Sequence, residues 1–145
     1  MYISSAYVTT CYRLFLVVAL MSVVALKAGA QYAQQAGPLY GTGASGSPMQ
    51  GNAVAVSADG NTMVVGGDVD NSYRGAVWIF TRAGTVWSQQ GSKLTGSDES
   101  GNGLLGFSVA ISADGNTVIA GAPSDSTPPF AAGSIGAAFV FVRSG

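Results

Sequence analysis

Seven carboxylates supply most of the chemistry available to this chain of 145 residues, because it contains no histidine and a single cysteine, Cys11. The lack of histidine excludes imidazole-based catalytic triads and nearly all zinc sites. Two carboxylates, Asp59 and Asp114, lie in identical hexapeptides, Ser-Ala-Asp-Gly-Asn-Thr. Ca²⁺ takes about six to eight oxygen ligands, several of them carboxylates, and each hexapeptide offers one. The pattern therefore favours a hairpin turn in which the glycine takes up a positive φ.

A second group of oxygen-bearing side chains consists of Asp68, Asp70 and Asn71. The corresponding stretch later in the chain, residues 124–126, reads Ser-Asp-Ser, so this group is not repeated. Turn formation is again the favoured interpretation. Asp59, Asp68, Asp70 and Asp114 are thus weak metal candidates only. We predict no cofactor, and calcium is disfavoured.

Other chemical motifs lack the context that they need. Asp98 and Glu99 form the only adjacent acidic pair, which could in principle hydrolyse glycosides, but a solvated Gly/Ser-rich connection explains the pair better. Residues 41–46 and 101–106 match the letters of a dinucleotide fingerprint, which requires a helix that Pro48 and the β pattern exclude. We predict no catalytic residue. Four aromatic residues could stack on a sugar, and core packing is favoured for them: Trp78, Phe80, Phe139 and Phe141.

The elements that must position these side chains are repeated. The hexapeptide at residues 57–62 recurs at 112–117, an offset of 55, and apolar positions around it recur in the same phase. A third, partial copy lies upstream, where Tyr32 stands at the position of Trp87. Four further residues of this copy keep the offset: Gln34, Gln35, Leu39 and Gly41 match Gln89, Gln90, Leu94 and Gly96.

Each repeat predicts four short strands. In the first repeat we expect strands at 52–57, 62–66, 75–81 and 86–95, the third of them apolar on both faces. Four strands per 55 residues is typical of a β-propeller blade, so the predicted fold class is all-β. The expected organisation is an isolated outer strand (Tyr32 to Leu39) with a linker in residues 31–49, one blade in 50–104, and a second blade in 105–145 that lacks its last strand.

The repeated sequence resembles that of one known family. Leu105 to Ile111, followed by Gly121-Ala122-Pro123, is similar to the FG-GAP repeat of integrin α-chain-like β-propellers, and most closely to its bacterial secreted branch. The resemblance covers residues 31–145 and implies a propeller repeat, calcium loops being common in the family. Two departures matter. At the positions of the FG and GAP motifs, the first repeat has Gln50-Gly51 and Gly66-Gly67-Asp68 instead. The calcium-binding loop of the family is also missing.

The N-terminal residues predict export. Residues 14–26 are apolar except for Ser22, and Ala28-Gly29-Ala30 follows, which is typical of a signal peptide cleaved after Ala30. A membrane anchor is the alternative, but a spanning helix needs roughly 20 apolar residues. We therefore expect residues 1–30 to be removed, leaving a secreted or cell-envelope protein without a stable membrane span. The remainder carries four basic and seven acidic residues, which argues against nucleic acid as a partner.

The predicted function is a non-catalytic module that binds a protein or a carbohydrate. Two alternatives stay open: a structural remnant or fragment of a longer propeller array without its own ligand, and a secreted hydrolase assembled by oligomerisation. Two blades do not close a propeller, which typically needs about four to eight. A homo-oligomer that closes a ring is therefore a further expectation.

Overall fold

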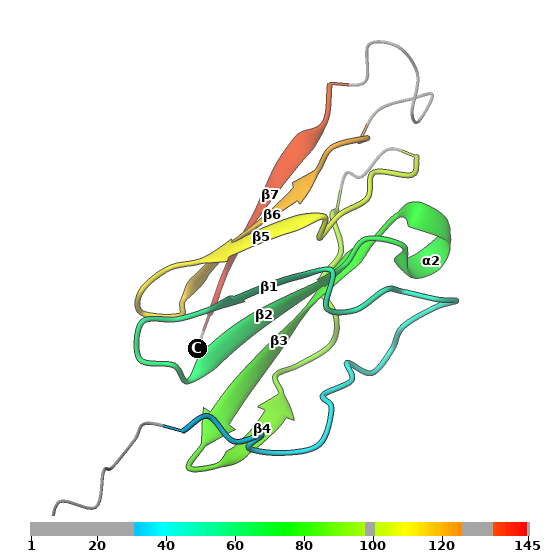
Figure 1. The fold of residues 1–145 in the computed structure, drawn as a ribbon. Coiled ribbons are helices and arrows are strands. Elements are labelled where there is room, and N and C mark those ends of the chain that lie inside the picture. Colours follow the sequence, from blue (N-terminus) through cyan, green and yellow to red (C-terminus); the bar gives the residue numbers. More distant parts are fainter. Residues whose placement is uncertain (1–30, 98–100, 126–134, 145) are drawn as a thin grey trace, which may run out of the picture. The chain divides into compact units, whose positions relative to one another are not determined.

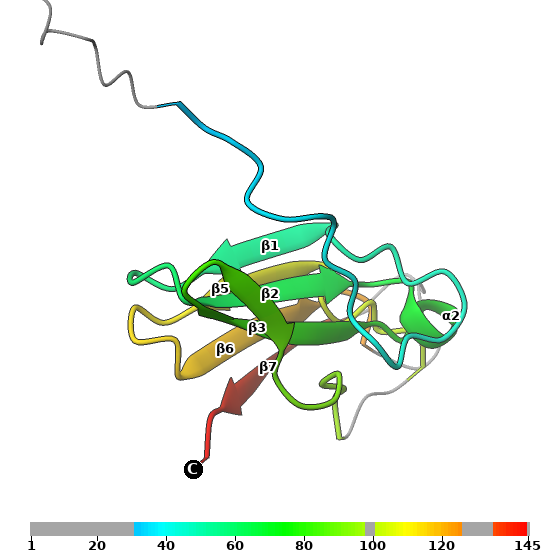
Figure 2. The ribbon, with the colours of Figure 1, turned by 90° about the horizontal axis from the view of Figure 1, so that it is seen from below.

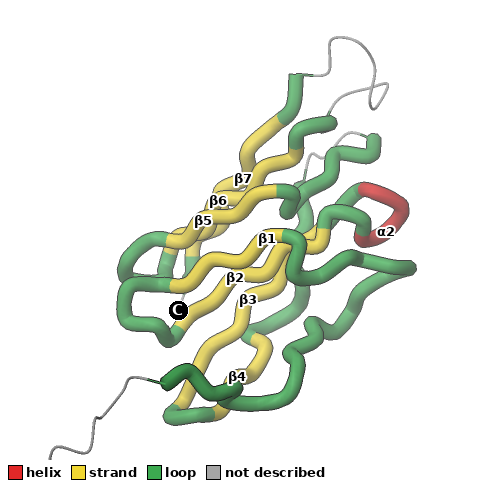
Figure 3. The backbone as a smooth tube through the Cα atoms, in the orientation of Figure 1, coloured by secondary structure: helices red, strands yellow, loops and turns green. Residues whose placement is uncertain are grey.

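The computed structural model describes residues 31–97, 101–125 and 135–144. The chain divides into two compact units, Met1–Gln34 and Gln35–Gly145, and all the described strands lie in the second. The described residues of this unit form β-strands and loops, with one short helical turn (Figure 1; Figure 3). Within the described residues, no helix is long and apolar enough to cross a membrane.

In the part of the chain that the structure describes, seven strands form two antiparallel sheets, ordered β1-β2-β3-β4 and β5-β6-β7. The first sheet contains β1 (Ala53–Val56), β2 (Thr62–Gly67), β3 (Ala76–Ala83) and β4 (Val86–Gln89). The second contains β5 (Ser108–Ile111), β6 (Thr117–Ala122) and β7 (Ala137–Val142). The helical turn α2 (Asp70–Tyr73) lies between β2 and β3. The two sheets are the blade-type units that the repeat predicts.

The second sheet reproduces the register of the first. β1 places Ala53 opposite Gly66 on β2, and β5 places Ser108 opposite Gly121 on β6, each residue being 55 positions later. Gly66 in turn faces Val77 on β3 in the pairing of β2 with β3. The sequence repeat is therefore a structural repeat, strand by strand.

The two sheets lie against each other (Figure 2), and apolar side chains from both of them form a common core. One face of the first sheet, here called its core face, contributes the buried Val64 and Val77. The second sheet contributes Val118, and Leu105 enters from the linker between the sheets. Phe139 and Phe141 are partly buried against this cluster, so their predicted role in core packing is confirmed.

The opposite face of the first sheet, here called the strap face, carries a second cluster. Its buried members are Val65, Ala76, Trp78 and Phe80. Because Trp78 and Phe80 alternate with Val77 and Ile79 along β3, this strand is apolar on both faces, as predicted. A strand covered on both faces reads as a nearly continuous apolar run.

Two predictions about strands need correction. The fourth strand ends at Gln89 rather than at 95, and the later Leu94 makes only an isolated bridge to Val77. The prediction of an isolated strand over Tyr32–Leu39 is wrong, because residues 31–50 contain no strand. A strand needs a neighbouring strand to satisfy its backbone, and none of the described strands pairs with this segment.

Candidate functional site

The two SADGNT turns have the same geometry, although they lie in different sheets. In the first, the Ser57 hydroxyl donates to Asp59 Oδ1 at 2.5 Å, and the Asn61 backbone N–H donates to the same oxygen at 3.0 Å. The Asn61 side-chain amide donates to Asp59 Oδ2 at 3.1 Å. Gly60 has φ 69°, a left-handed conformation that glycine adopts at no steric cost. The expected turn at Asp-Gly is therefore present.

The copy at Asp114 repeats these contacts. The Ser112 hydroxyl donates to Asp114 Oδ1 at 2.5 Å, and the Asn116 side chain donates to Oδ2 at 3.1 Å. The hydrogen bond from each serine, followed by those from each asparagine, lowers the pKa of Asp59 and of Asp114 below the ordinary value of 3.8. Both oxygens of each carboxylate thus accept hydrogen bonds within their own turn.

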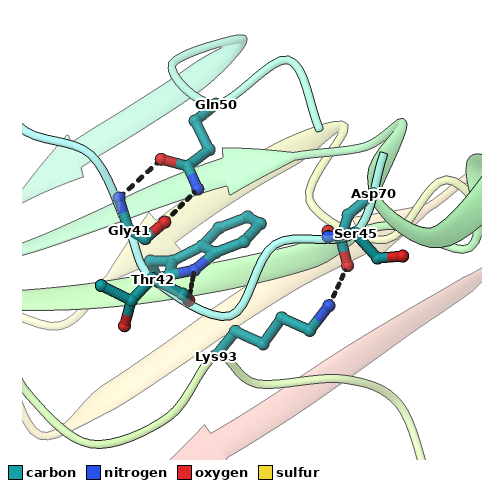
Figure 4. A network of polar contacts seen from close by, with 7 residues as sticks. Gly41, Thr42, Ser45, Gln50, Asp70 and Lys93 are labelled. Carbon is teal, nitrogen blue, oxygen red and sulfur yellow. Dashed lines mark hydrogen bonds and ion pairs between the residues drawn. The ribbon is translucent and has the colours of Figure 1, made fainter. Parts of the chain in front are cut away.

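The aspartates at the end of β2 have different surroundings from each other. Asp70 is fully buried, accepts a hydrogen bond from the Ser45 backbone N–H at Oδ1 (2.7 Å), and forms an ion pair with Lys93 at Oδ2 (Figure 4). Asp68 is nearly buried, and its Oδ1 contacts no donor. Among the described residues, no three or more acidic or cysteine side chains gather in a way that could hold a metal ion.

A strap formed by residues 41–50 covers the strap face of the first sheet (Figure 4). The Trp78 indole N–H donates to the Thr42 carbonyl at 2.8 Å, and the Gln50 side chain both donates to and accepts from the Gly41 backbone. A Cβ built on Gly41 would lie 2.1 Å from the Trp78 ring, so only glycine permits this approach. The strap thereby completes the burial of Trp78.

The turn α2 has an unusual backbone. Three consecutive residues other than glycine, Asn71, Ser72 and Tyr73, have φ values of 50°, 59° and 69°. For L-residues this conformation costs roughly 1–2 kcal/mol each, so single residues are the rule. The side chains of residues 71–74 are exposed, whereas Asp70 beneath them is buried. Such strained segments concentrate at functional sites, which makes this turn the candidate site.

Backbone contacts hold the turn from two sides. The Asn71 N–H donates to the Ser45 carbonyl in the strap at 3.0 Å. The Leu104 N–H, from the linker between the sheets, donates to the Tyr73 carbonyl at 2.9 Å. Sequence reasoning predicted a turn around Asp68 and Asp70, but it predicted neither the left-handed run nor the pairing of Asp70 with Lys93.

Other candidates lie apart from this turn or outside the described residues. No helix follows either dinucleotide-like stretch, because the strap leads into β1 and residues 101–106 lead into β5. The acidic pair Asp98-Glu99 and the predicted cleavage site at Ala28 and Ala30 lie outside the described residues. Their roles therefore stay predictions.

Comparison with known proteins identifies the repeat. The family model of the FG-GAP repeat matches residues 87–141. The chain carries an FG-GAP repeat. The match begins in β4 of the first sheet and ends in β7 of the second, so one FG-GAP repeat spans an outer strand and the three strands of the next sheet. A search of curated proteins found no match.

Proposed function

We propose that this FG-GAP repeat chain is an exported, non-catalytic module of the β-propeller type that binds a protein or a carbohydrate through the turn α2. The observation that carries the proposal is the run of left-handed residues, Asn71 to Tyr73, next to the ion pair of the buried Asp70 with the partly buried Lys93. The buried Asp70, bonded to both the strap and Lys93, fixes the turn from below. A binding site held on a rigid support loses less entropy when it binds.

The exposed side chains of the turn suit recognition rather than catalysis. Residues 71–74 provide an amide, a hydroxyl, a phenol and a guanidinium group. Tyrosine, serine and asparagine dominate binding loops because they combine contact area with adaptable hydrogen bonding. The phenol of Tyr73 also offers an apolar face with a polar tip, which suits both protein and sugar surfaces.

The test compares two tyrosine variants on a glycan array and in pull-downs of extracellular and cell-surface proteins. Tyr73→Ala should abolish binding of a specific ligand, because it removes the largest exposed side chain of the turn. Tyr40→Ala is the matched control, since Tyr40 is also exposed but lies outside the turn. Absence of any specific ligand, or equal loss in both variants, would overturn the proposed binding role.

Export is tested on the purified protein. The apolar run before Ala30 and the register of the upstream repeat, which reaches Tyr32, support removal of residues 1–30. N-terminal sequencing of the protein recovered outside the cytoplasm should begin at Gln31. A product found in the cytoplasm with residues 1–30 intact would contradict export and leave the binding role to be judged separately.

A further inference from the structure

Three pairs in this chain place an aspartate or an asparagine directly before a glycine: Asp59-Gly60, Asn102-Gly103 and Asp114-Gly115. In such a pair, the backbone nitrogen of the glycine can attack the side-chain carbonyl carbon of the residue before it and close a succinimide ring. Glycine favours this attack because it has no Cβ to obstruct the approach of its nitrogen. The hydrogen bonds around each pair therefore decide which of them can react.

The two aspartate pairs are held by their own turns. Both carboxylate oxygens of Asp59 accept hydrogen bonds, and the Gly60 N–H donates to the Ser57 carbonyl at 2.9 Å. Asp114 and Gly115 repeat this pattern in the second turn. The attacking nitrogen and the carboxylate that it would attack are thus both engaged, so the fold opposes ring closure at these two pairs.

The pair Asn102-Gly103 has different surroundings in the linker between the sheets. Asn102 is partly exposed, so water reaches its side chain, and Gly103 is buried. Neither the Asn102 side chain nor the Gly103 N–H forms a hydrogen bond with another described residue. The attacking nitrogen and its target are therefore both available in the folded protein.

The remaining asparagines are less suited to this reaction. The side-chain amides of Asn61 and Asn116 donate to the aspartate of their own turn at 3.1 Å, and each of these residues is followed by a threonine. The branched side chain of threonine restricts the approach of its nitrogen. Asn52 precedes an alanine and Asn71 precedes a serine, so a Cβ obstructs the attack in both cases. Asn102 alone combines an unbonded amide with a following glycine.

We propose that Asn102 is a site of self-modification, at which reaction with water converts the asparagine to isoaspartate and loosens the turn α2. The Gly103 nitrogen forms a bond to Asn102 Cγ, the bond from Cγ to the amide nitrogen breaks, and the Gly103 proton leaves with that nitrogen as ammonia. Water then adds to one of the two ring carbonyls and breaks its bond to the ring nitrogen. Opening at Cγ gives aspartate, and opening at the main-chain carbonyl gives isoaspartate.

Isoaspartate lengthens the main chain by one carbon atom next to a contact that holds α2. The Leu104 N–H donates to the Tyr73 carbonyl at 2.9 Å. Leu105 is fully buried in the core between the sheets, so the added length is not passed further along the chain. It must be accommodated at Gly103 and Leu104. The modification should therefore weaken the bond between the linker and Tyr73.

Peptide mapping by tandem mass spectrometry tests the conversion. The purified protein is incubated at mildly alkaline pH in water enriched in a heavy oxygen isotope. Residue 102 should gain the mass of an amide exchanged for a carboxylate, with one oxygen taken from the labelled water, and an isoaspartyl methyltransferase should methylate the same peptide. Conversion at Asn102 should be at least about tenfold faster than at Asn116, a difference in barrier of about 1.4 kcal/mol.

Two controls separate the chemistry of the pair from the effect of the fold. Asn102→Gln keeps the amide but would have to close a larger ring, so methylation at residue 102 should disappear. In urea, where the turns lose their hydrogen bonds, isoaspartate should also form at Asp59 and Asp114. Retention of the Asn102 amide in the folded protein, or equal rates at Asn102 and Asn116, would overturn the proposal.

Hydrogen exchange tests the effect on α2. The Leu104 amide should exchange faster in the converted protein than in fresh protein, because its bond to Tyr73 is weakened. The Leu94 amide, which donates to the Val77 carbonyl at 2.8 Å, is the matched control and should not change. Equal exchange at Leu104 before and after conversion would overturn the loosening of the turn. No ligand is needed for these measurements, so they are independent of the ligand screen with Tyr73→Ala.

Discussion

Replacement of Gly66 by alanine tests the close approach between β2 of the first sheet and Gly106, which leads into the second sheet. Gly66 lies on the core face of β2, and a Cβ built on it would stand 2.0 Å from the carbonyl oxygen of Gly106. Real Cβ atoms essentially never approach a neighbour closer than 3.0 Å. The Gly106 oxygen belongs to the backbone and cannot rotate away. The two sheets would therefore have to separate by about 1 Å along their shared core.

The cost of this separation falls on the core between the sheets. Overpacking a well-packed interior typically costs about 1–3 kcal/mol, and the backbone position of the obstacle places Gly66→Ala near the upper limit. Urea unfolding of a small domain has a slope of about 1–3 kcal/mol per molar, so a loss near 3 kcal/mol should lower the midpoint by roughly 1–3 M. An unchanged midpoint would show that the sheets do not approach each other at Gly66.

The repeat provides the matched control, Gly121→Ala. Gly121 occupies the equivalent position on β6, but a Cβ built there meets only the Ser108 hydroxyl, at 2.4 Å, and a side chain of this kind can change its rotamer. Its expected loss of unfolding free energy is below about 1 kcal/mol. Equal losses in the two variants would attribute the effect to the strand itself rather than to sheet stacking, and would refute the reasoning.

Three further predictions concern the polar contacts. Lys93→Met should cost about 3–5 kcal/mol of unfolding free energy, because it leaves the fully buried Asp70 without its cationic partner; the double variant with Asp70→Asn should recover much of this loss in urea unfolding. Ser57→Ala should raise the pKa of Asp59 toward 3.8 in a carboxyl NMR titration and leave Asp114 unchanged. The hydrogen bond lowers the pKa of Asp59 in the folded protein, so its stabilising effect is complete above the pKa of the unfolded chain and is lost as the pH falls through the folded-state pKa. The unfolding free energies of the variant and the wild type should therefore differ least in strong acid. Trp78→Phe should cost about 1 kcal/mol by removing the indole bond to Thr42, and should speed hydrogen exchange in residues 41–50.

The strands were largely predictable because their signals are local. Alternation along β3 and the Asp-Gly turns depend on neighbouring residues, and the 55-residue offset fixes the equivalence of the sheets. The segment around Tyr32 was predicted wrongly for the opposite reason. Its residues match β4, but β4 is a strand because β3 lies beside it, and similarity of sequence does not supply that neighbour.

The strap was also beyond prediction from the sequence. Residues 41–50 are rich in glycine and serine, a composition that indicates a flexible linker. Their order comes from Trp78, which lies 36 residues away from Thr42 and bonds its carbonyl. The only signal available was the apolarity of both faces of β3, which shows that something must cover the second face without showing what does.

The shape of the candidate binding turn depends on contacts between distant parts of the chain. Three consecutive left-handed residues are disfavoured by about 1–2 kcal/mol each, so no local preference of Asn71, Ser72 and Tyr73 explains them. The conformation persists because backbone groups of the strap and of the linker between the sheets bond Asn71 and Tyr73. Both partners are themselves held in place by the two sheets, the strap through Trp78 and the linker through Leu105 in the core. The fold thus offsets the strain of the turn, and loosening the strap should relax the turn before it unfolds the sheets.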